Sequence, residues 1–319
     1  MEYTAVIRTL GTAGSKYQKL LDSLVAQTLR PSKIIVYIAE GYPLPKETVG
    51  IEEYIYVKKG MVAQRALQYK EVNTEYILFL DDDLVLSADF VSGMYRELTA
   101  QKADVISPDI YDHSQIRSLG ALMMYVSGRM CGRKDDGKWG YKVMRNAGYS
   151  YNKNPRKPSY LSQTNAGACF LCKKEDFLSI HFEEEFWLDA VAYPLGEDQA
   201  MYYKMYLHGL KIITWYNCGI VHLDAGDNTN PNKKKSLIYS DFRFKTIFWH
   251  RFIYISEKSV AKRAWDILCI VYAFAFTLLI SLIKLDFGIF RVKQSAMRDA
   301  IRFIESEEYR KIPIIKKNI

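Results

Sequence analysis

The sequence contains little cysteine. Five residues, an odd number, are scattered over 319 positions, at Cys131, Cys169, Cys172, Cys218 and Cys269. This scatter argues against a disulfide framework and favours a reducing compartment. Cys169 and Cys172 form a lone CxxC pair, and because no second pair or clustered histidine accompanies it, we expect no structural zinc site there. We interpret both cysteines as small buried apolar residues.

A secretory leader and internal repetition are also missing. The first residues, MEYTAVIRTLG, contain no charged segment followed by an apolar one, so we expect the chain to begin in the cytoplasm. No internal repeat and no low-complexity segment is visible. With 319 residues, 49% of them hydrophobic, the chain can bury a large core in one domain, or in one domain with an appendage.

Basic residues outnumber acidic residues in this sequence. The 44 Lys and Arg residues against 36 Asp and Glu give a formal charge of +8. This excess suits anionic partners such as nucleotide phosphates or acidic lipid head groups, and does not choose between them. We expect no nucleic-acid partner.

Strand and helix patterns alternate along the first third of the chain, which is typical of an α/β sheet. Strands are predicted at Tyr3–Arg8, within SKIIVYIAEG at 32–41, at Ile55–Val57 and at Tyr76–Leu80, and helices at 15–28, Met61–Tyr69 and Leu84–Tyr95. Residues 128–158, rich in Gly, Lys, Arg, Asn and Tyr, are predicted to form an irregular excursion, the usual place for a mobile substrate loop.

Three consecutive carboxylates, Asp81, Asp82 and Asp83, directly follow the strand that ends at Leu80. Like charges this close are costly unless a cation, donor groups or solvent offsets them. Carboxylates at a strand end provide hard oxygen ligands for Mg²⁺ or Mn²⁺ on a diphosphate, with room left for phosphates and water. The alternative is that they cap a helix beginning near Ser87. Glu40 also follows a strand, at the sheet edge where ligands bind in such folds.

Two weaker patterns lie downstream. Glu197 and Asp198 follow Gly196 at the start of a predicted helix, where the helix dipole keeps a carboxylate ionised, as a general base requires. Ordinary acidic preference at helix N-termini explains them equally well. His222 follows a predicted strand and fits either a structural role or a metal-ligand role.

The order of these segments resembles a family 2 glycosyltransferase of the GT-A fold, a Rossmann-like, mostly parallel sheet flanked by helices. The segments are IIVYIAEG, GMVAQRAL, EYILFLDDD, a Gly-Ala strand and GEDQAMYYKMYLHG. The resemblance covers roughly Tyr3 to Asp224, and its most specific parts are the strand with DDD and the later Glu-Asp pair.

On the donor side, the resemblance implies that Asp83 ligates the metal and that Asp81 and Asp82 face the ribose and the metal shell. Glu40 would bind the nucleotide base, although the family more often has Asp there. Donor contacts are also implied for Thr9 and Arg65. His222 fits a third metal ligand found in some relatives.

On the acceptor side, Asp198 matches the base that deprotonates an acceptor hydroxyl for one in-line, inverting displacement. Glu197, Trp187 and Asp189 would contact the acceptor, where an aromatic ring can stack on a sugar, although Trp187 fits a core position equally well. Processive members carry Gln-x-x-Arg-Trp after the base. No such string occurs here, so the resemblance favours transfer of one sugar per encounter.

The C-terminal part contains 17 uncharged residues at 267–283, the lower limit for crossing a hydrocarbon layer roughly 30 Å thick. Basic residues flank both ends, which argues against a simple span. We favour a helix lying in the inner leaflet over a single span or a buried helix. The predicted division is a catalytic domain at 1–230 and a helical, membrane-associating region at 231–319.

The sequence thus predicts a metal-dependent enzyme at the cytoplasmic face of the membrane. It would transfer single sugars from a nucleotide-sugar to a glycan or lipid-linked acceptor in polysaccharide or glycolipid synthesis. The alternatives are a nucleotidyltransferase, and an inactive relative that binds glycans or acts as a scaffold.

Overall fold

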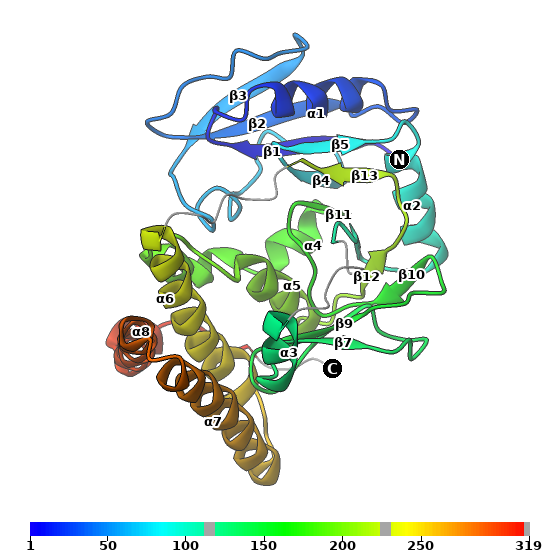
Figure 1. Ribbon diagram of the computed structural model, residues 1–319. Helices are drawn as coiled ribbons and strands as arrows, with labels where there is room; N and C mark the ends of the chain where they lie inside the picture. The colour runs from blue at the N-terminus through cyan, green and yellow to red at the C-terminus, as the bar shows by residue number, and fades with distance from the viewer. Residues whose placement is uncertain (112–118, 224–230, 316–319) are drawn as a thin grey trace.

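An eight-stranded mixed sheet forms the centre of the computed structural model, which describes residues 1–111, 119–223 and 231–315 (Figure 1). Its order is β10-β12-β6-β11-β4-β1-β2-β3. The strands are β1 (Tyr3–Thr9), β2 (Lys33–Ala39), β3 (Glu52–Val57), β4 (Tyr76–Asp81), β6 (Val105–Pro108), β10 (Ser159–Leu161), β11 (Cys169–Lys173) and β12 (Ile212–Trp215). Strands β1 to β4 are parallel, as are β6 and β12, while β11 runs against both its neighbours and β10 against β12. The predicted α/β class is confirmed.

Both faces of this sheet are buried, which explains the nearly continuous apolar runs of its strands. Along β1, Ala5 and Ile7 belong to one core and Val6 to the other. Helices α1 (Ser15–Val25) and α2 (Phe90–Ala100) cover the first face. The second face is covered by α4 (Lys174–Ser179), the 3₁₀ segment η1 (Phe182–Ala190) and α5 (Glu197–Leu207). Cys169 and Cys172 are buried, as interpreted from the sequence.

One predicted helix is wrong, and another begins later than predicted. Residues Leu84–Leu86 form strand β5, which pairs with β13 (Ile220–His222), and helix α2 starts only at Phe90. The segment Met61–Tyr69 forms short hydrogen-bonded turns instead of a regular helix. Tyr69 has a left-handed backbone at φ 48°, and its hydroxyl donates to the Arg65 carbonyl that a continuing helix would have used.

The excursion at 128–158 contains more regular structure than its composition indicates. It forms a small sheet of β7 (Met130–Arg133), β8 (Tyr141–Val143) and β9 (Tyr149–Asn152), in the order β7-β9-β8. Helix α3 (Leu119–Val126) precedes it. Period-2 patterning is weak in such short strands, so turn-rich composition hid them.

The C-terminal region consists of α6 (Pro231–Phe248), the π-helical segment η2 (Trp249–Tyr254), α7 (Val260–Ile283), α8 (Phe287–Glu305) and α9 (Glu307–Arg310). Phe248 and Phe252 enter the same core as the second sheet face. Arg251 is buried with them and donates to Glu185 of η1 at 2.8 Å. The boundary at 230 and Asp224 lie outside the described residues, and the two-part division stays a prediction.

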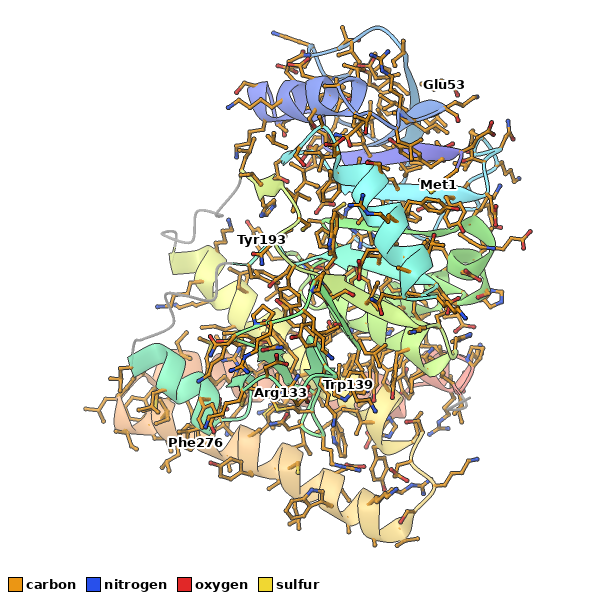
Figure 2. The ribbon with its side chains drawn as sticks, turned by 90° about the vertical axis from the view of Figure 1, so that its right-hand side faces the viewer. Met1, Glu53, Arg133, Trp139, Tyr193 and Phe276 are labelled. Carbon is orange, nitrogen blue, oxygen red and sulfur yellow. The ribbon has the colours of Figure 1, made fainter. Side chains whose placement is uncertain are left out.

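Helix α7 differs from its neighbours because it extends away from the rest of the molecule (Figure 1). Within the described ranges it is the one helix long and apolar enough to cross a membrane, with a mean hydropathy of 2.4 in a window of which 28% is buried. It contains the predicted apolar segment 267–283 and begins with a Ser259 side-chain cap on the Lys262 N–H. Helix α3 lies beside it near Phe276 (Figure 2), and Tyr272 Oη donates to the Val126 carbonyl at 2.9 Å.

Candidate active site

The acidic triplet lies where β4 ends and the chain turns into β5. Asp81 is the last residue of β4, and the β1–β4 register places Arg8 opposite it. Arg8 Nε donates to Asp81 Oδ1 at 2.6 Å. Burial disfavours the Asp81 charge, but Arg8 and Arg65 outweigh it and lower the pKa of Asp81. The first carboxylate is therefore ionised and held by arginine.

Asp82 has a different environment. Thr9 Oγ1 donates to its carboxylate and itself accepts from the Gly11 N–H at 2.8 Å. Burial, with the neighbouring charges of Asp81 and Asp83, raises the pKa of Asp82 to about 6 despite the Thr9 hydrogen bond. Among the described residues this carboxylate has no basic partner of the kind that Asp81 has, so added positive charge nearby would stabilise it.

Asp83 provides the clearest fit to a cation. Strand β13 pairs with β5 and brings His222 Nε2 to 3.2 Å from Asp83 Oδ1. That oxygen is buried, and among the described residues no donor reaches it in hydrogen-bonding geometry. A buried carboxylate oxygen without a donor is costly, and a divalent cation would satisfy it. Across the described ranges no group of three or more His, Cys, Asp and Glu side chains has the spacing to hold a metal by itself.

A cavity of about 900 Å³, here called the triplet cavity, opens in front of these carboxylates. Its lining comprises Arg8, Thr9, Leu10, Thr12, Ala13, Lys16, Lys59, Gly60, Met61, Gln64, Asp81, Asp82, Asp83, Asp189, Val191, Ala192 and Pro194. Acidic and basic groups thus face one another across a space large enough for a nucleotide. Glu40 is exposed after β2 and is not part of this lining.

A buried arginine pair connects the triplet to α5. Arg65 Nε lies 3.0 Å from Glu197 Oε1, and Arg8 Nη1 donates to the same oxygen at 3.0 Å. Arg65 Nη1 also lies 3.4 Å from Asp198 Oδ1, and its Nη2 donates to the Gly167 carbonyl at 2.9 Å. Burial raises the pKa of Glu197 to about 8, against the opposing effect of both arginines. Because each guanidinium has several acidic partners, this network fixes the position of α5 relative to β4.

Asp198 lies in the first turn of α5, two residues after Gly196, whose backbone is left-handed at φ 82°. Its carboxylate packs closely against Gly167, where a Cβ would come within 1.9 Å of Asp198 Oδ1. About a third of the Asp198 side chain is exposed, at 36%, so its carboxylate is accessible to a substrate.

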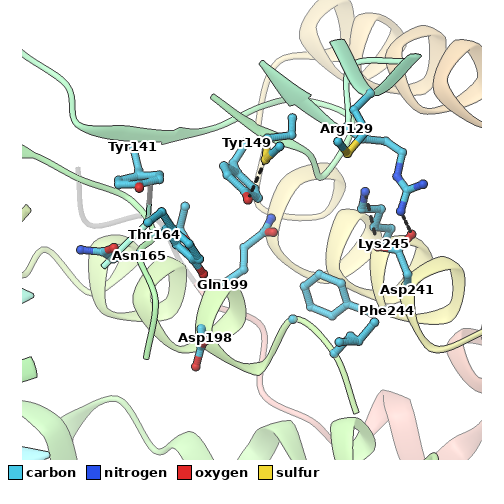
Figure 3. A pocket seen from close by; sticks show the side chains of 15 residues that line it. Arg129, Tyr141, Tyr149, Thr164, Asn165, Asp198, Gln199, Asp241, Phe244 and Lys245 are labelled. Atoms are coloured by element: carbon cyan, nitrogen blue, oxygen red, sulfur yellow. Dashed lines mark hydrogen bonds and ion pairs between the residues drawn. The ribbon is translucent and has the colours of Figure 1, made fainter. Parts of the chain in front are cut away.

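Asp198 faces a second cavity, of about 370 Å³, here called the Asp198 cavity (Figure 3). Figure 3 shows Asp198 apart from the group of Arg129, Asp241 and Lys245. The lining comprises Tyr111, Met124, Arg129, Met130, Tyr141, Tyr149, Thr164, Asn165, Leu195, Gly196, Asp198, Gln199, Asp241, Phe244 and Lys245. Its aromatic rings and amides are the side chains that bind sugars, by stacking and by hydrogen bonding.

Comparison with known proteins bears on both cavities. Residues 53–178, which run from β3 through the triplet to α4, match the family described as Glycosyl transferase family 2. This part of the chain therefore resembles a family 2 glycosyltransferase domain. A crystal structure of GalNAc-T7 with UDP, GalNAc and Mn²⁺ shares the GT-A fold, with a TM-score of 0.50 at 12% sequence identity. The match covers 86% of this chain and 55% of that chain. No curated protein sequence matches significantly.

The predicted acceptor residues do not lie together. Trp187 is 1% exposed and donates to Glu185 at 2.8 Å within the core. Asp189 lines the triplet cavity, where it accepts from Val62 and Ala63. Glu197 is buried against the arginines. Their acceptor roles stay predictions. None of these three residues lines the Asp198 cavity, whereas Asp198, the predicted base, does.

Several residues that line the two cavities were not predicted from the sequence. Arg8 was recognisable as a charge near the end of an otherwise apolar strand. Lys16 and Lys59 had no distinguishing pattern. Tyr141 and Tyr149 lie in the excursion at 128–158, whose composition indicated a substrate loop without selecting residues.

Proposed function

We propose that this chain transfers one sugar at a time from a nucleotide-sugar to a hydroxyl of a glycan or lipid-linked acceptor, with inversion. The observation that carries the proposal is the position of Asp198 between two spaces. It lines one cavity, and through Arg65 it is tied to Asp81 of the other. A donor in the triplet cavity and an acceptor in the Asp198 cavity would therefore meet at this carboxylate.

The donor nucleotide occupies the triplet cavity in this proposal. Lys16 and Lys59, which line this cavity, would face its phosphates, Thr9 would contact the nucleotide, and Asp81 and Asp82 would face the ribose and the metal shell. Asp83 and His222 would hold Mg²⁺ or Mn²⁺. The buried Asp83 oxygen, which lies 3.2 Å from His222 Nε2 and accepts no hydrogen bond from the described residues, supports this fit. When bound, the ion neutralises the developing charge of the departing nucleoside diphosphate. That GalNAc-T7 was solved with UDP and Mn²⁺ is consistent with such a donor. Glu40 remains proposed for the base.

Asp198 acts as general base in this proposal. It takes the proton from the acceptor hydroxyl as that oxygen attacks the anomeric carbon, and the bond to the diphosphate oxygen breaks on the opposite side. One displacement of this kind inverts the configuration. Arg65 and Gly167 hold the carboxylate in place, so little ordering is needed when the acceptor arrives.

We further propose that α7 lies along the inner leaflet, which places the enzyme peripherally at the cytoplasmic face of the membrane. Its apolar side chains are exposed, as Leu268 at 60% and Val271 at 56% illustrate. Basic residues before and after it suit acidic lipid head groups. A membrane position favours polysaccharide or glycolipid synthesis as the setting.

The test is calorimetric binding of a panel of nucleoside diphosphates to the full chain, with and without Mn²⁺. We expect one nucleotide to bind tightly only with Mn²⁺, and Asp83→Ala to abolish that dependence. Asp22→Ala, on the exposed side of α1, is the matched control and should bind as the wild type does. Binding that ignores both metal and Asp83, or no binding at all, would overturn the donor assignment.

The reaction products then separate the rivals. Turnover should release nucleoside diphosphate, whereas a nucleotidyltransferase would release pyrophosphate. Metal-dependent binding without any turnover over a panel of acceptors would identify an inactive, glycan-binding relative.

A further inference from the structure

A basic group lies in the Asp198 cavity, away from the donor side. Arg129, next to β7, donates to Asp241 of α6, and Lys245 Nζ lies 3.5 Å from the other Asp241 oxygen. Both cations line the cavity (Figure 3). Two cations share this carboxylate, and the other carboxylate of the lining, Asp198, is paired with Arg65. Counted over the part of the chain that the structure describes, the group therefore has a surplus positive charge.

This surplus is held in a poorly solvated place. The Lys245 side chain is only 12% exposed, and burial together with Arg129 lowers the pKa of its ammonium to about 8, although Asp241 opposes the shift. A further lysine, Lys293 of α8, donates to the Thr277 carbonyl at 2.8 Å and to Ser281 Oγ at 2.9 Å. Buried charges are costly unless they are paired, so an anion that entered the cavity would be bound favourably.

The basic group also adjoins the apolar C-terminal helices. A small cavity behind it is lined by Arg129, Asp241 and Lys245 together with Ala273, Phe274 and Thr277 of α7. Phe274 additionally lines an apolar groove of about 470 Å³ formed by the end of α6, η2, α7 and α8. Helix α3 lies beside α7 and exposes Leu122 at 53% and Tyr125 at 58%. The order in space is thus Asp198, then the basic group, then apolar surface.

We propose that Arg129 and Lys245 bind the phosphate of a lipid-linked acceptor, whose sugar reaches Asp198 and whose lipid lies against α7. This inference rests on the proposed function and names its acceptor class. A sugar joined through phosphate to an apolar chain carries these three chemical parts in the same order as the residues that would contact them. A neutral glycan acceptor would leave the surplus charge without a partner.

The test uses decyl diphosphate, below its micelle concentration, as the probe in calorimetry with the full chain. EDTA is present and the Asp83→Ala variant is measured in parallel, so that the diphosphate does not bind through metal at the triplet. We expect Lys245→Met and Arg129→Met each to weaken binding roughly 10- to 100-fold, because each removes a charge-assisted hydrogen bond. Lys235→Met, an exposed lysine on the same helix, should have no effect.

Two further probes identify the source of the phosphate. Decyl maltoside should bind far more weakly than decyl diphosphate, because it has the apolar chain without the anion. Inorganic pyrophosphate should also bind more weakly, because it lacks the chain. If pyrophosphate bound as tightly as decyl diphosphate, a soluble phosphorylated acceptor would replace the lipid-linked one and the lipid part of the inference would fail.

Folding is controlled by thermal unfolding and by Lys245→Arg, which keeps the charge and should keep most of the binding. Equal binding of decyl diphosphate by the wild type and both methionine variants would overturn the inference. If that happened while nucleoside diphosphates still bound with metal, the proposed function would stand without it. If decyl diphosphate required Arg129 and Lys245 but no nucleoside diphosphate bound, the phosphate site would stand and the donor assignment would fail.

Discussion

The two cavities of this protein are built in different ways. The triplet cavity takes three of its four acidic groups from consecutive residues at the end of β4. The Asp198 cavity collects side chains from segments far apart in the chain, including the small sheet, the start of α5 and α6. A compact acidic pattern can be recognised in a sequence, whereas a surface assembled by packing cannot. In the proposed function the donor nucleotide binds in the triplet cavity and the acceptor in the Asp198 cavity.

The largest expected effect comes from replacing Asp198, which lines one cavity and is tied through Arg65 to Asp81 of the other. Asp198→Asn keeps the shape of the side chain but removes the base, so we expect the rate of nucleoside diphosphate release to fall about 10²- to 10⁴-fold. Metal-dependent nucleotide binding should remain, since the triplet is unchanged. Steady-state rates and calorimetry on the same variant check both parts. A rate within a few-fold of the wild type would exclude Asp198 as the base.

Substitutions on the exposed apolar face of α7 should weaken membrane binding without changing the donor site. Leu268→Asp with Val271→Asp places two charges on the exposed face of α7, and we expect binding to anionic phospholipid vesicles to weaken about 100-fold. Nucleotide binding should not change. Vesicle sedimentation measures the first quantity and calorimetry the second. Unchanged sedimentation would place the membrane contact elsewhere or remove it.

The close contact at Gly167 offers a smaller perturbation of the same base. In Gly167→Ala the new Cβ would meet Asp198 Oδ1 at 1.9 Å and Arg65 Nη1 at 2.4 Å, so both groups must shift. We expect up to about 100-fold slower transfer with nucleotide affinity retained, because misplacement by about 1 Å has effects of this size. Gly288→Ala is the control, since its Cβ would have only one neighbour, Asp286 Oδ1 at 3.6 Å. Equal rates for both variants would contradict the positioning role.

The smallest expected effect is a pH dependence of the free energy of unfolding, caused by Lys245 of the basic group. Lys245 releases its proton near pH 8 in the folded protein, and near pH 10.4 when unfolded. The unfolded chain binds more protons in that window, so the free energy of unfolding should rise with pH by about 1–3 kcal/mol relative to Lys245→Met. Asp241 and Arg129 act on the Lys245 charge, and the same two groups act on Lys293. The pKa of Lys293 is also lowered to about 8, so Lys293 adds a pH dependence of the same sign. Because Lys293 is present in both proteins, its contribution cancels in the comparison with Lys245→Met.

Urea unfolding of both proteins at pH 7.5, 8.5 and 9.5 measures this difference. A wild type whose stability parallels that of Lys245→Met over the whole series would contradict the lowered pKa. Binding of decyl diphosphate should weaken over the same interval, because Lys245 loses its charge.

Much of the donor side followed from local sequence. The buried run before Asp81 predicted both a strand and its end, and consecutive carboxylates there required a compensating charge. The helix predictions at Met61–Tyr69 and Leu84–Tyr95 failed, wholly or in part, for different reasons. At Tyr69 the left-handed backbone and the hydrogen bond of the hydroxyl to the Arg65 carbonyl end the turns. At Leu84–Leu86 strand β13, which is distant in sequence, pairs with the backbone groups that a helix would have used.

By itself the sequence determined the α/β class, the order of the first strands, the acidic triplet and the apolar helix, because each depends on residues that are neighbours in the chain. Only the tertiary structure decided that Arg8 and Arg65 tie the triplet to Glu197 and Asp198, that Trp187 is core, and that Arg129 reaches the carboxylate that Lys245 also contacts. Most of these contacts join segments separated by dozens of residues. Their formation depends on how the helices pack against the sheet, which no local pattern of side chains specifies.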